Sequence, residues 1–384
     1  MNDKHQATNS KTYLPMKTNI TLLLLLFATA SFAQTIRRVN NNPGVSGTNI
    51  YTTIQAAHDA AANGDIIYVE PSGNSYGNLE MNKQLTIYGN GYFLEQNIGI
   101  AVDTRLSTIG TTNIYSGASG SNLEGLTSQS SVNIYSANSI SIRRNRIAGL
   151  TVTTQTASNS GVYSNLSSLS IIGNYIVSTG SPNGISMDSG SKTITNVLIS
   201  SNFILIRQNA SYFFSINSAN ITGVVLRNNL IAADFIKIAN ATLADNLIIT
   251  NVESAFTSAQ IATCCYNYYS NVSFMNNAGL ILPAGDGNIN NVDVKGEFAQ
   301  AYPCGGGTCL TGATYDSDSR FQLKSGSSLK TAGTGGIEIG PFGGSTPYKL
   351  SGIPSTPSIS KFNPTPTGSS TTPLSVIIST KSNN

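Results

Sequence analysis

The chain has 384 residues, of which 10% are charged, and its formal net charge is +3. Residues 1–33 contain three lysines and one aspartate, so 18 of the 21 basic and 17 of the 18 acidic residues lie beyond them. This near-neutral balance excludes the basic surface that nucleic-acid-binding proteins carry. The length is enough for one elongated domain with a single core, so we expect no second globular domain.

The first predicted element is a secretory signal peptide over residues 1–33. Its sequence "MKTNITLLLLLFATASFAQ" places an apolar stretch after Lys17 and small residues before a cleavage site at Ala33. The apolar stretch is too short to span a membrane. Met16 is an alternative start, which would make residues 1–15 an extension. We therefore expect a secreted protein, extracellular or at the cell surface, without a membrane-spanning segment.

Residues 34–80 are predicted to form an N-terminal cap and the first coil of a repeated structure. The sequence "YTTIQAAHDAAANG" indicates a short helix over Thr53–Ala62, with Thr52 as its N-cap. Apolar residues share one face of this helix and can close the end of a core. His58 and Asp59 are expected to be exposed polar residues of the cap.

A repeated pattern fills the next segment, the coils predicted over residues 81–310. It reads apolar-x-apolar-x-x-Asn-x-apolar, and the steps between its best copies are 29, 28 and 27 residues. A period of this size indicates a solenoid, and alternating Val, Ile, Phe and Tyr indicate strands rather than helices. We predict an all-β, right-handed parallel β-helix. The pattern places asparagines at Asn90, Asn145, Asn174, Asn202, Asn229 and Asn246.

These repeated asparagines are predicted to be structural corner residues. Asparagine tolerates the left-handed backbone that a sharp turn needs, and its side chain binds local backbone groups. Coils stacked about 4.8 Å apart would also let successive amides bind one another as a ladder.

The residues that flank the inward side chain after each corner should face outward. They form an apolar stripe, which we call the outer stripe: Tyr175, Val177, Phe203, Leu205, Leu230, Ala232, Leu247 and Ile249. Soluble proteins rarely leave such a surface bare. We expect the Pro/Ser/Thr-rich tail, residues 345–384, to pack along it through Phe362 and Leu374–Ile378.

Two segments resemble a known family. "TIQAAHDAAANGDIIYVEPS" followed by "LTIYGNG" resembles the opening of secreted proteins of the pectin lyase-like β-helix superfamily. "DSDSRFQLKSGSSLKTAGTGGIEIGPFGG" is similar to the closing segment of bacterial members, so residues 311–344 are predicted to close the solenoid. The resemblance implies fold and export. It does not imply one activity, because the superfamily includes lyases, hydrolases and proteins of unassigned function.

Catalytic candidates follow from this resemblance. Superfamily hydrolases use clustered aspartates, commonly beside a histidine, and the coils contain no such cluster. A lyase needs a basic residue to take the proton beside a uronate carboxylate, and a cation to neutralise that carboxylate. The basic candidates are Arg143, Arg144, Arg146, Arg207 and Lys237. The Ca²⁺ candidates, from two oxygen-rich loops, are Asp286, Asp293, Asp316 and Asp318. The plainer interpretation of "RRNR" is a solvated corner, with a clamp for an anionic group as the alternative.

Four cysteines occur, and export would permit disulfides between them. Cys304 and Cys309 flank the short sequence "CGGGTC", while Cys264 and Cys265 are adjacent. Three pairings are possible, and the sequence does not choose among them. We interpret these cysteines as a structural staple rather than a redox site.

No catalytic site is evident from the sequence. The principal hypothesis is a secreted monomer that binds glycans or forms part of a cell-surface structure or adhesin. The alternative is a polysaccharide lyase that cleaves a uronate-containing polymer by β-elimination. An extracellular polysaccharide or a cell-surface component is the expected partner, and no cofactor is expected apart from the Ca²⁺ that a lyase would use.

Overall fold

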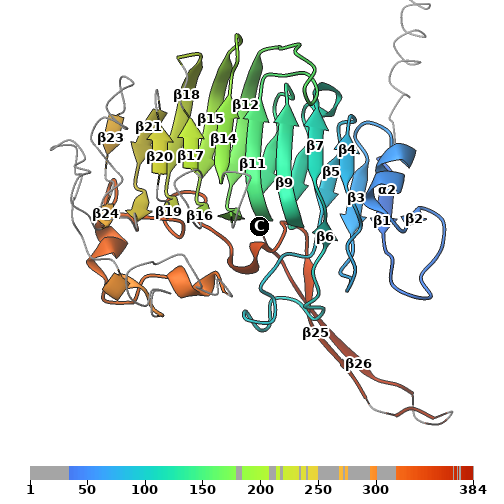
Figure 1. Ribbon diagram of the computed structural model, residues 1–384. Helices are drawn as coiled ribbons and strands as arrows, with labels where there is room; N and C mark the ends of the chain where they lie inside the picture. The colour runs from blue at the N-terminus through green and yellow to red at the C-terminus, as the bar shows by residue number, and fades with distance from the viewer. Residues whose placement is uncertain are drawn as a thin grey trace, which may run out of the picture. The chain divides into compact units, whose positions relative to one another are not determined.

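Two large parallel β-sheets form the walls of the computed structural model (Figure 1). The chain divides into two units, Met1–Thr35 and Ile36–Asn384, and the fold below is that of the second unit. The predicted signal peptide, residues 1–33, lies outside the described residues. The described residues are 34–178, 184–206, 213–216, 219–232, 235–238, 241–249, 268–270, 273–275, 295–300, 317–365, 367–369, 371 and 373–383.

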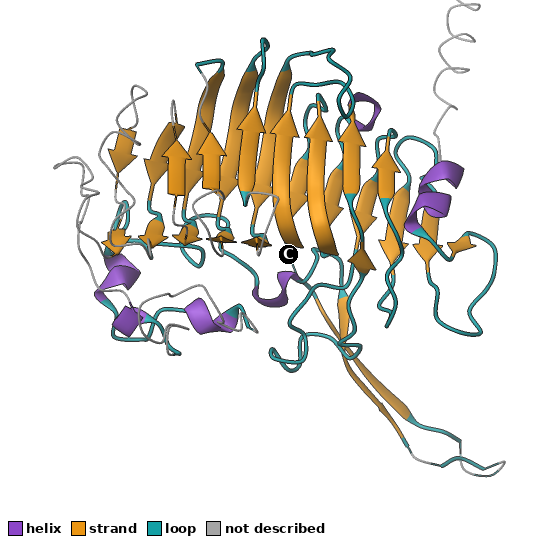
Figure 2. Ribbon diagram, in the orientation of Figure 1, coloured by secondary structure: helices purple, strands orange, loops and turns teal. Residues whose placement is uncertain are grey.

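From β3 (Ile66–Val69) onward, each turn of the chain adds strands to both sheets (Figure 2). The first sheet has the described strands β2 (Ile50–Tyr51), β1 (Ile36–Val39), β3 (Ile66–Val69), β5 (Thr86–Tyr88), β8 (Asn122–Glu124), β10 (Ser141–Arg143), β12 (Leu166–Ile172), β15 (Ile194–Ser200), β18 (Ile221–Arg227), β21 (Ala241–Ala244) and β23 (Tyr268–Ser270), in this spatial order. The second sheet has β4 (Leu79–Met81), β6 (Thr108–Ile109), β7 (Thr112–Tyr115), β9 (Thr127–Tyr135), β11 (Arg146–Thr153), β13 (Tyr175–Ser178), β14 (Ile185–Asp188), β16 (Phe203–Ile206), β17 (Phe213–Ile216), β19 (Leu230–Ala232), β20 (Phe235–Ile238), β22 (Leu247–Ile249) and β24 (Ser273–Met275). The helices are α2 (Ile54–Ala60) and the 3-10 turns η1 (Ser116–Ala118), η2 (Lys295–Glu297), η3 (Ser319–Phe321), η4 (Ser328–Thr331) and η5 (Leu350–Gly352).

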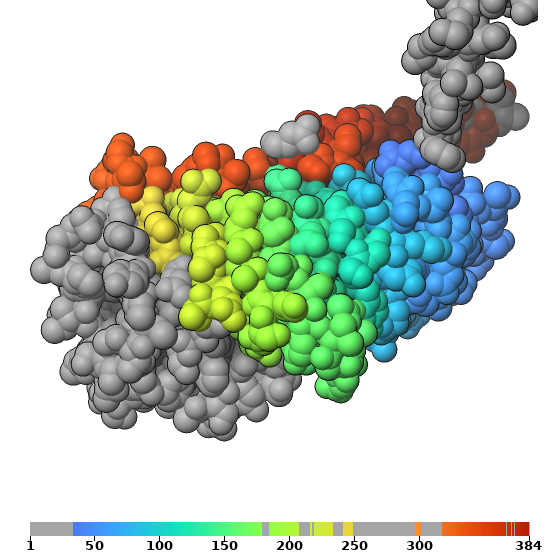
Figure 3. Space-filling model, turned by 90° about the horizontal axis from the view of Figure 1, so that it is seen from above, coloured from blue at the N-terminus to red at the C-terminus, as the bar shows by residue number. Residues whose placement is uncertain are grey.

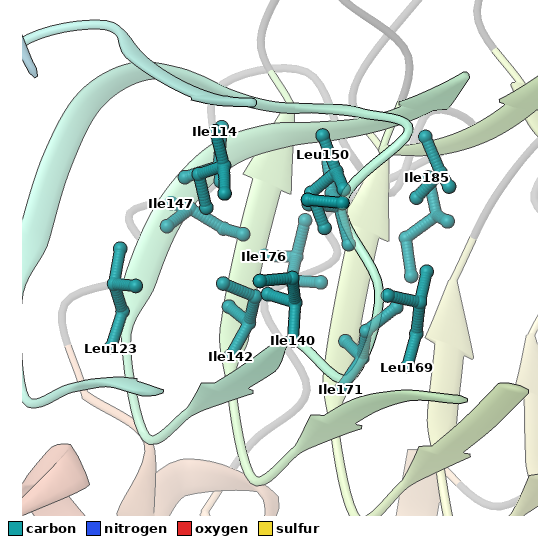
Figure 4. Close-up of a cluster of buried hydrophobic side chains, with 14 of the residues drawn as sticks. Ile114, Leu123, Ile140, Ile142, Ile147, Leu150, Leu169, Ile171, Ile176 and Ile185 are labelled. Carbon is teal, nitrogen blue, oxygen red and sulfur yellow. The ribbon is translucent and has the colours of Figure 1, made fainter. Parts of the chain in front are cut away.

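Strand pairing follows the predicted repeat. Ile142 pairs with Ile171, and Ile171 pairs with Ile199, in parallel register one coil further along each time. These side chains are at most 1% exposed, and they stack with their neighbours into a continuous apolar column (Figure 4). Parallel strands joined by right-handed crossovers give this arrangement. The predicted all-β, right-handed parallel β-helix is confirmed.

Helix α2 covers one end of the core. The Thr53 hydroxyl accepts a hydrogen bond from the Ala56 N–H at 3.2 Å, so Thr53 is the N-cap and the prediction of Thr52 is wrong by one residue. His58 is 1% exposed, and its Nε2 accepts a hydrogen bond from Asn82 N at 3.2 Å. The prediction of an exposed His58 is therefore wrong, because its ring helps to bind the cap to the first coil.

Buried amides form a column at the corner between the sheets. In each step the Oδ1 of one asparagine accepts from both N–H and Nδ2 of the asparagine one coil earlier, at 2.8–3.3 Å. Each Nδ2 also donates to a main-chain carbonyl, as Asn202 does to Ile171 O at 2.8 Å. We call this column the Asn ladder. Its members are Asn145, Asn174, Asn202, Asn229 and Asn246, all at most 2% exposed.

Asn90 lies outside the Asn ladder, contrary to the prediction. Its Nδ2 donates to Asp103 O at 2.7 Å, since the chain leaves β5 for a long loop instead of turning directly into the second sheet. The ladder begins where Leu126 N donates to Asn145 Oδ1 at 2.9 Å. Leu126 therefore holds the corner position of the coil before Asn145.

The left-handed turn residue also differs from the prediction. None of the Asn ladder members has a positive φ. The positive φ falls on the residue before each of them: Arg144, Gly173, Ser201, Asn228 and Asp245. The corner is thus divided between one residue that turns the chain and an asparagine whose side chain binds the coils together.

The outer stripe is covered, as expected. Tyr175, Phe203 and Leu230 are 0% exposed although they project from the outer side of the second sheet. The cover consists of the described residues 298–300 and 317–348, which supply Phe298, Phe321, Leu323, Leu329, Ile339 and Tyr348. The ring centroid of Phe203, for example, lies 4.7 Å from that of Tyr348 and 5.3 Å from that of Phe321. Figure 3 shows the orange C-terminal segment running along one side of the coils.

The proposed route of the tail is wrong in its second part. A C-terminal segment does pack along the outside, through Tyr348 and Ile353. Phe362 and Leu374–Ile378, however, do not reach the outer stripe: their large apolar side chains remain 40–57% exposed. They belong to an antiparallel hairpin, β25 (Ser358–Pro364) and β26 (Val376–Lys381), because the stripe is already filled by aromatic residues of the cover.

Candidate functional site

The three arginines of "RRNR" do not converge on one site. Arg143 belongs to β10 in the first sheet, and Arg146 to β11 in the second. The Arg146 guanidinium lies 5.1 Å from the centroid of the Phe93 ring, an arrangement that favours a cation–π contact. Arg144 lies at the corner between them with a φ of 52°. The three side chains thus belong to two different sheets and to the corner between them, and no common clamp forms.

Arg144 is an internal anchor. Its guanidinium lies 3.1 Å from Glu124 Oε1, and the two side chains are 10% and 1% exposed. It also donates to Ile353 O at 3.1 Å and to Asn383 O at 3.2 Å. Burial lowers the pKa of Arg144, while Glu124 acts in the opposite direction. Through these contacts Arg144 joins the coils to the C-terminal segment.

Asp318, a predicted Ca²⁺ ligand, is buried in a network of protein donors. Its carboxylate accepts from Asn97 Nδ2 at 2.8 Å, from Tyr348 Oη at 2.9 Å and from Ser351 N at 2.6 Å. Burial raises the pKa of the Asp318 carboxyl, and the three donors partly oppose that effect. The Tyr348 hydroxyl in turn contacts Tyr92 Oη at 2.7 Å. Asp318 therefore links the coils, the cover and the tail, instead of lying in an open loop.

The other predicted site residues cannot be placed at a site. Arg207, Asp286, Asp293, Asp316 and the four cysteines lie outside the described residues. Lys237 lies in β20, of which only the backbone is described. Within the described ranges, no group of three or more His, Cys, Asp and Glu side chains is arranged to hold a metal ion.

A polar and aromatic surface lies on the outer side of the second sheet, over β4, β7, β9, β11 and β14. Alternate residues of these strands face the core, as Ile114 and Ile134 do, both 0% exposed. The residues between them face outward and align across the coils in the order Glu80, Asn113, Asn133, Thr151 and Ser186. Two residues further along the strands, on the same face, Tyr115 aligns with Tyr135. We call Glu80, Asn113, Asn133, Tyr115 and Tyr135 the tyrosine platform.

Hydrogen bonds hold the polar side chains of the tyrosine platform in fixed positions. Glu80 accepts from Asn113 Nδ2 at 2.7 Å and from Tyr115 Oη at 2.5 Å. Asn113 Oδ1 accepts from Asn133 Nδ2 at 2.8 Å. Desolvation and the hydrogen bond to Glu80 raise the pKa of Tyr115 to about 12. The platform is thus pre-organised, with the Tyr115 hydroxyl in its neutral form at physiological pH.

The two tyrosine rings form an aromatic stack. Their centroids are 5.4 Å apart and their planes differ by 18°, while both side chains remain partly exposed. Stacked, rigid rings offer apolar contact at little entropic cost, and the neighbouring carboxylate and amides offer hydrogen bonds. This combination suits a ligand that has both C–H faces and hydroxyl groups.

The motif "NIY" is the signal that could have revealed this surface. It occurs at Asn113–Tyr115 and again at Asn133–Tyr135, 20 residues apart. That step is shorter than the 27–29 residues of the regular coils, so the repeat that located the Asn ladder does not bring the two copies into register.

No model of a known protein family matches the chain, and neither does any curated protein. A solved structure titled "Crystal structure of pectate lyase Pel9A" is similar, with 11% identity and a TM-score of 0.40 over 81% of this chain and 97% of that chain. A likeness at this level bears on neither activity nor ligand. Within the described residues, no helix is long and apolar enough to cross a membrane.

Proposed function

We propose that this chain is a secreted glycan-binding protein and that the tyrosine platform is its binding surface. The observation that carries the proposal is the stacked pair Tyr115 and Tyr135 beside the hydrogen-bonded carboxylate of Glu80. A pyranose ring has the matching chemistry, because its C–H face packs on an aromatic ring while its hydroxyls bind carboxylates and amides.

The charge of the platform indicates a neutral glycan. Glu80 is exposed, and the residues aligned with it are the uncharged Asn113, Asn133, Thr151 and Ser186. A uronate carboxylate brought against Glu80 would meet a like charge, which disfavours it. We therefore expect neutral, hydroxyl-rich polysaccharides to bind better than polyuronates.

Affinity electrophoresis against a panel of soluble polysaccharides tests the proposal. The double variant Tyr115→Ala/Tyr135→Ala should bind the preferred neutral glycan at least tenfold more weakly, which corresponds to about 1.4 kcal/mol or more. The matched control is Tyr68→Ala/Tyr88→Ala, which removes another stacked pair, 5.5 Å apart, from the first sheet. If only Tyr68→Ala/Tyr88→Ala lost glycan binding, the site would lie away from the tyrosine platform.

The purified wild-type protein also tests the lyase alternative. Incubation with polygalacturonate and Ca²⁺, followed by the absorbance of an unsaturated product, reports β-elimination. Product formation would favour the lyase and contradict a binding function confined to neutral glycans. Absence of both binding and product across the panel would leave the structural or adhesive role.

A further inference from the structure

The hairpin of β25 and β26 projects away from the stacked coils (Figure 1). Its strands pair with each other in antiparallel register and form a two-stranded sheet of their own among the described strands. A two-stranded hairpin is marginally stable by itself in water. A hairpin that protrudes in this way therefore needs either strong anchoring or a binding partner.

The root of the hairpin is firmly anchored. Asn383 Nδ2 donates to Thr356 O at 2.8 Å, while Asn383 O accepts from the buried Arg144 at 3.2 Å. Val102 N donates to Ile359 O at 2.9 Å, which fixes the start of β25 against a loop of the coils. The hairpin thus leaves the body in a defined direction.

One face of the hairpin is apolar. Phe362 is paired with Ile378 and Pro364 with Val376, so these four side chains lie on the same side. Phe362 is 52% and Ile378 is 54% exposed. We call this side the apolar hairpin face. The other side carries Lys361, Asn363, Ile377, Ser379 and Lys381.

The apolar hairpin face continues into a cavity at its root. The cavity has a volume of about 350 Å³, and its apolar lining includes Phe362 together with Val102, Ile353 and Pro357. Val102 is itself 46% exposed. Contiguous exposed apolar surface of this kind marks an interaction site.

The charged side chains of the tail are all positive. Residues 345–384 contain Lys349, Lys361 and Lys381 and no Asp or Glu. Both Lys361 and Lys381 are exposed. Asp103, which also lines the cavity, is neutralised by Arg105 at 2.7 Å. An apolar face opposite a lysine-bearing face is the pattern of segments that lie in the interface of an anionic membrane.

A second copy of the chain fits this face less well. The hairpin spans six residue pairs, so one of its faces covers roughly 20 Å by 10 Å, or about 200 Å², whereas a stable protein interface needs about 800 Å² per partner. A lipid surface has no such minimum, since each apolar side chain that enters it contributes separately.

We propose that the apolar hairpin face binds an anionic lipid surface, with Phe362, Val376 and Ile378 entering the lipid and the lysines facing its headgroups and the solvent. The binding is peripheral, because the hairpin is too short and too polar on its second face to cross a bilayer. It is independent of the tyrosine platform, which lies on the second sheet.

Vesicle co-sedimentation tests this proposal with the chain from Gln34 onward, since the apolar stretch before it would bind lipid by itself. Vesicles of phosphatidylcholine are compared with vesicles that also contain phosphatidylglycerol. We expect at least tenfold tighter binding to the mixed vesicles. The double variant Phe362→Ser/Ile378→Ser should lose at least tenfold, and Lys361→Glu/Lys381→Glu should abolish the preference for anionic lipid.

Ile377→Ser is the matched control for Ile378→Ser. The two isoleucines are adjacent and each is 54% exposed, but they lie on opposite faces of the hairpin. Ile377→Ser should change binding less than threefold, so an equal loss in both single variants would overturn the proposal. So would wild-type protein that binds neither vesicle, or a solution dimer in sedimentation velocity that the Ile378→Ser variant dissociates. Glycan binding should be unchanged in these hairpin variants, which distinguishes lipid binding by the hairpin from glycan binding by the tyrosine platform.

Discussion

At the scale of single residues, the polar groups inside this protein join segments that are far apart in sequence. Asp318 binds Asn97 and Ser351, and Arg144 binds Glu124 and Asn383. Buried charges of this kind are costly unless they are paired or hydrogen-bonded. Their positions therefore report how the C-terminal segment is attached to the coils.

The buried carboxyl of Asp318 predicts a pH dependence. Because its pKa is raised above 3.8 by burial, the folded state binds the proton more tightly than the unfolded state does. The free energy of unfolding contributed by this group therefore falls as the pH rises from about 3.8 to the folded pKa, and it is constant above that value. Asp318→Asn should remove this slope in urea unfolding series measured from about pH 4 upward.

The control for this series is Glu95→Gln, which changes an exposed carboxyl and should leave the slope as in the wild type. Identical pH profiles for the wild type and Asp318→Asn would show that the carboxyl does not titrate differently in the fold.

At the scale of elements, the Asn ladder fixes the vertical alignment of the coils. Asn202 Oδ1 accepts two hydrogen bonds from Asn174, and its own amide donates to Ile171 O and Asn229 Oδ1. All these groups are buried, so each lost partner leaves a donor or acceptor without water. The ladder should therefore contribute more to stability than polar residues on the surface of the same coils.

Asn202→Ala should lower the free energy of unfolding by about 3–5 kcal/mol, because it leaves several buried groups unsatisfied. The matched control is Asn165→Ala at an exposed corner, where Asn165 Oδ1 accepts from Thr193 N at 3.2 Å. We expect the control to cost less than about 1 kcal/mol in guanidinium unfolding. Similar losses for both variants would argue against a special role of the ladder.

The strands and the Asn ladder could be predicted because regular alternation and a near-constant step leave a direct trace in the sequence. The same repeat does not reveal the tyrosine platform, since its two "NIY" copies are 20 residues apart and belong to coils outside the regular step. The prediction that Asn90 belongs to the Asn ladder was wrong for a related reason. Its local pattern matches the motif, but the chain after it enters a loop whose length no local pattern reveals.

At the scale of the whole molecule, a buried ion pair connects the coils to the hairpin. Glu124 lies in the first sheet, and its carboxylate accepts a hydrogen bond from Ser355 N at 3.1 Å and forms an ion pair with Arg144. Arg144 in turn donates hydrogen bonds to the main-chain oxygens of Ile353 and Asn383. That a C-terminal segment would pack on the coils was predictable from the apolar outer stripe, but which part of the tail would do so depended on these irregularly spaced polar contacts.

Arg144→Leu should destabilise the protein by about 3–5 kcal/mol, because it leaves the charge of Glu124 buried without its cation. It should also release the root of the hairpin, so limited proteolysis within residues 354–383 should become faster. Arg143→Leu is the control, since Arg143 is only partly buried and, among the described residues, forms no hydrogen bond or ion pair with the tail. Unchanged proteolysis in Arg144→Leu would mean that the hairpin is held by its other contacts alone.

Neighbouring asparagines of the ladder are 29, 28, 27 and 17 residues apart, yet their hydrogen bonds have the same geometry. The number of residues per coil thus varies only in the loops that connect the strands of the two sheets. Such a scaffold can gain or lose a dozen residues in one layer while the layers above and below stay in place. New surface can therefore arise locally, without any redesign of the interior.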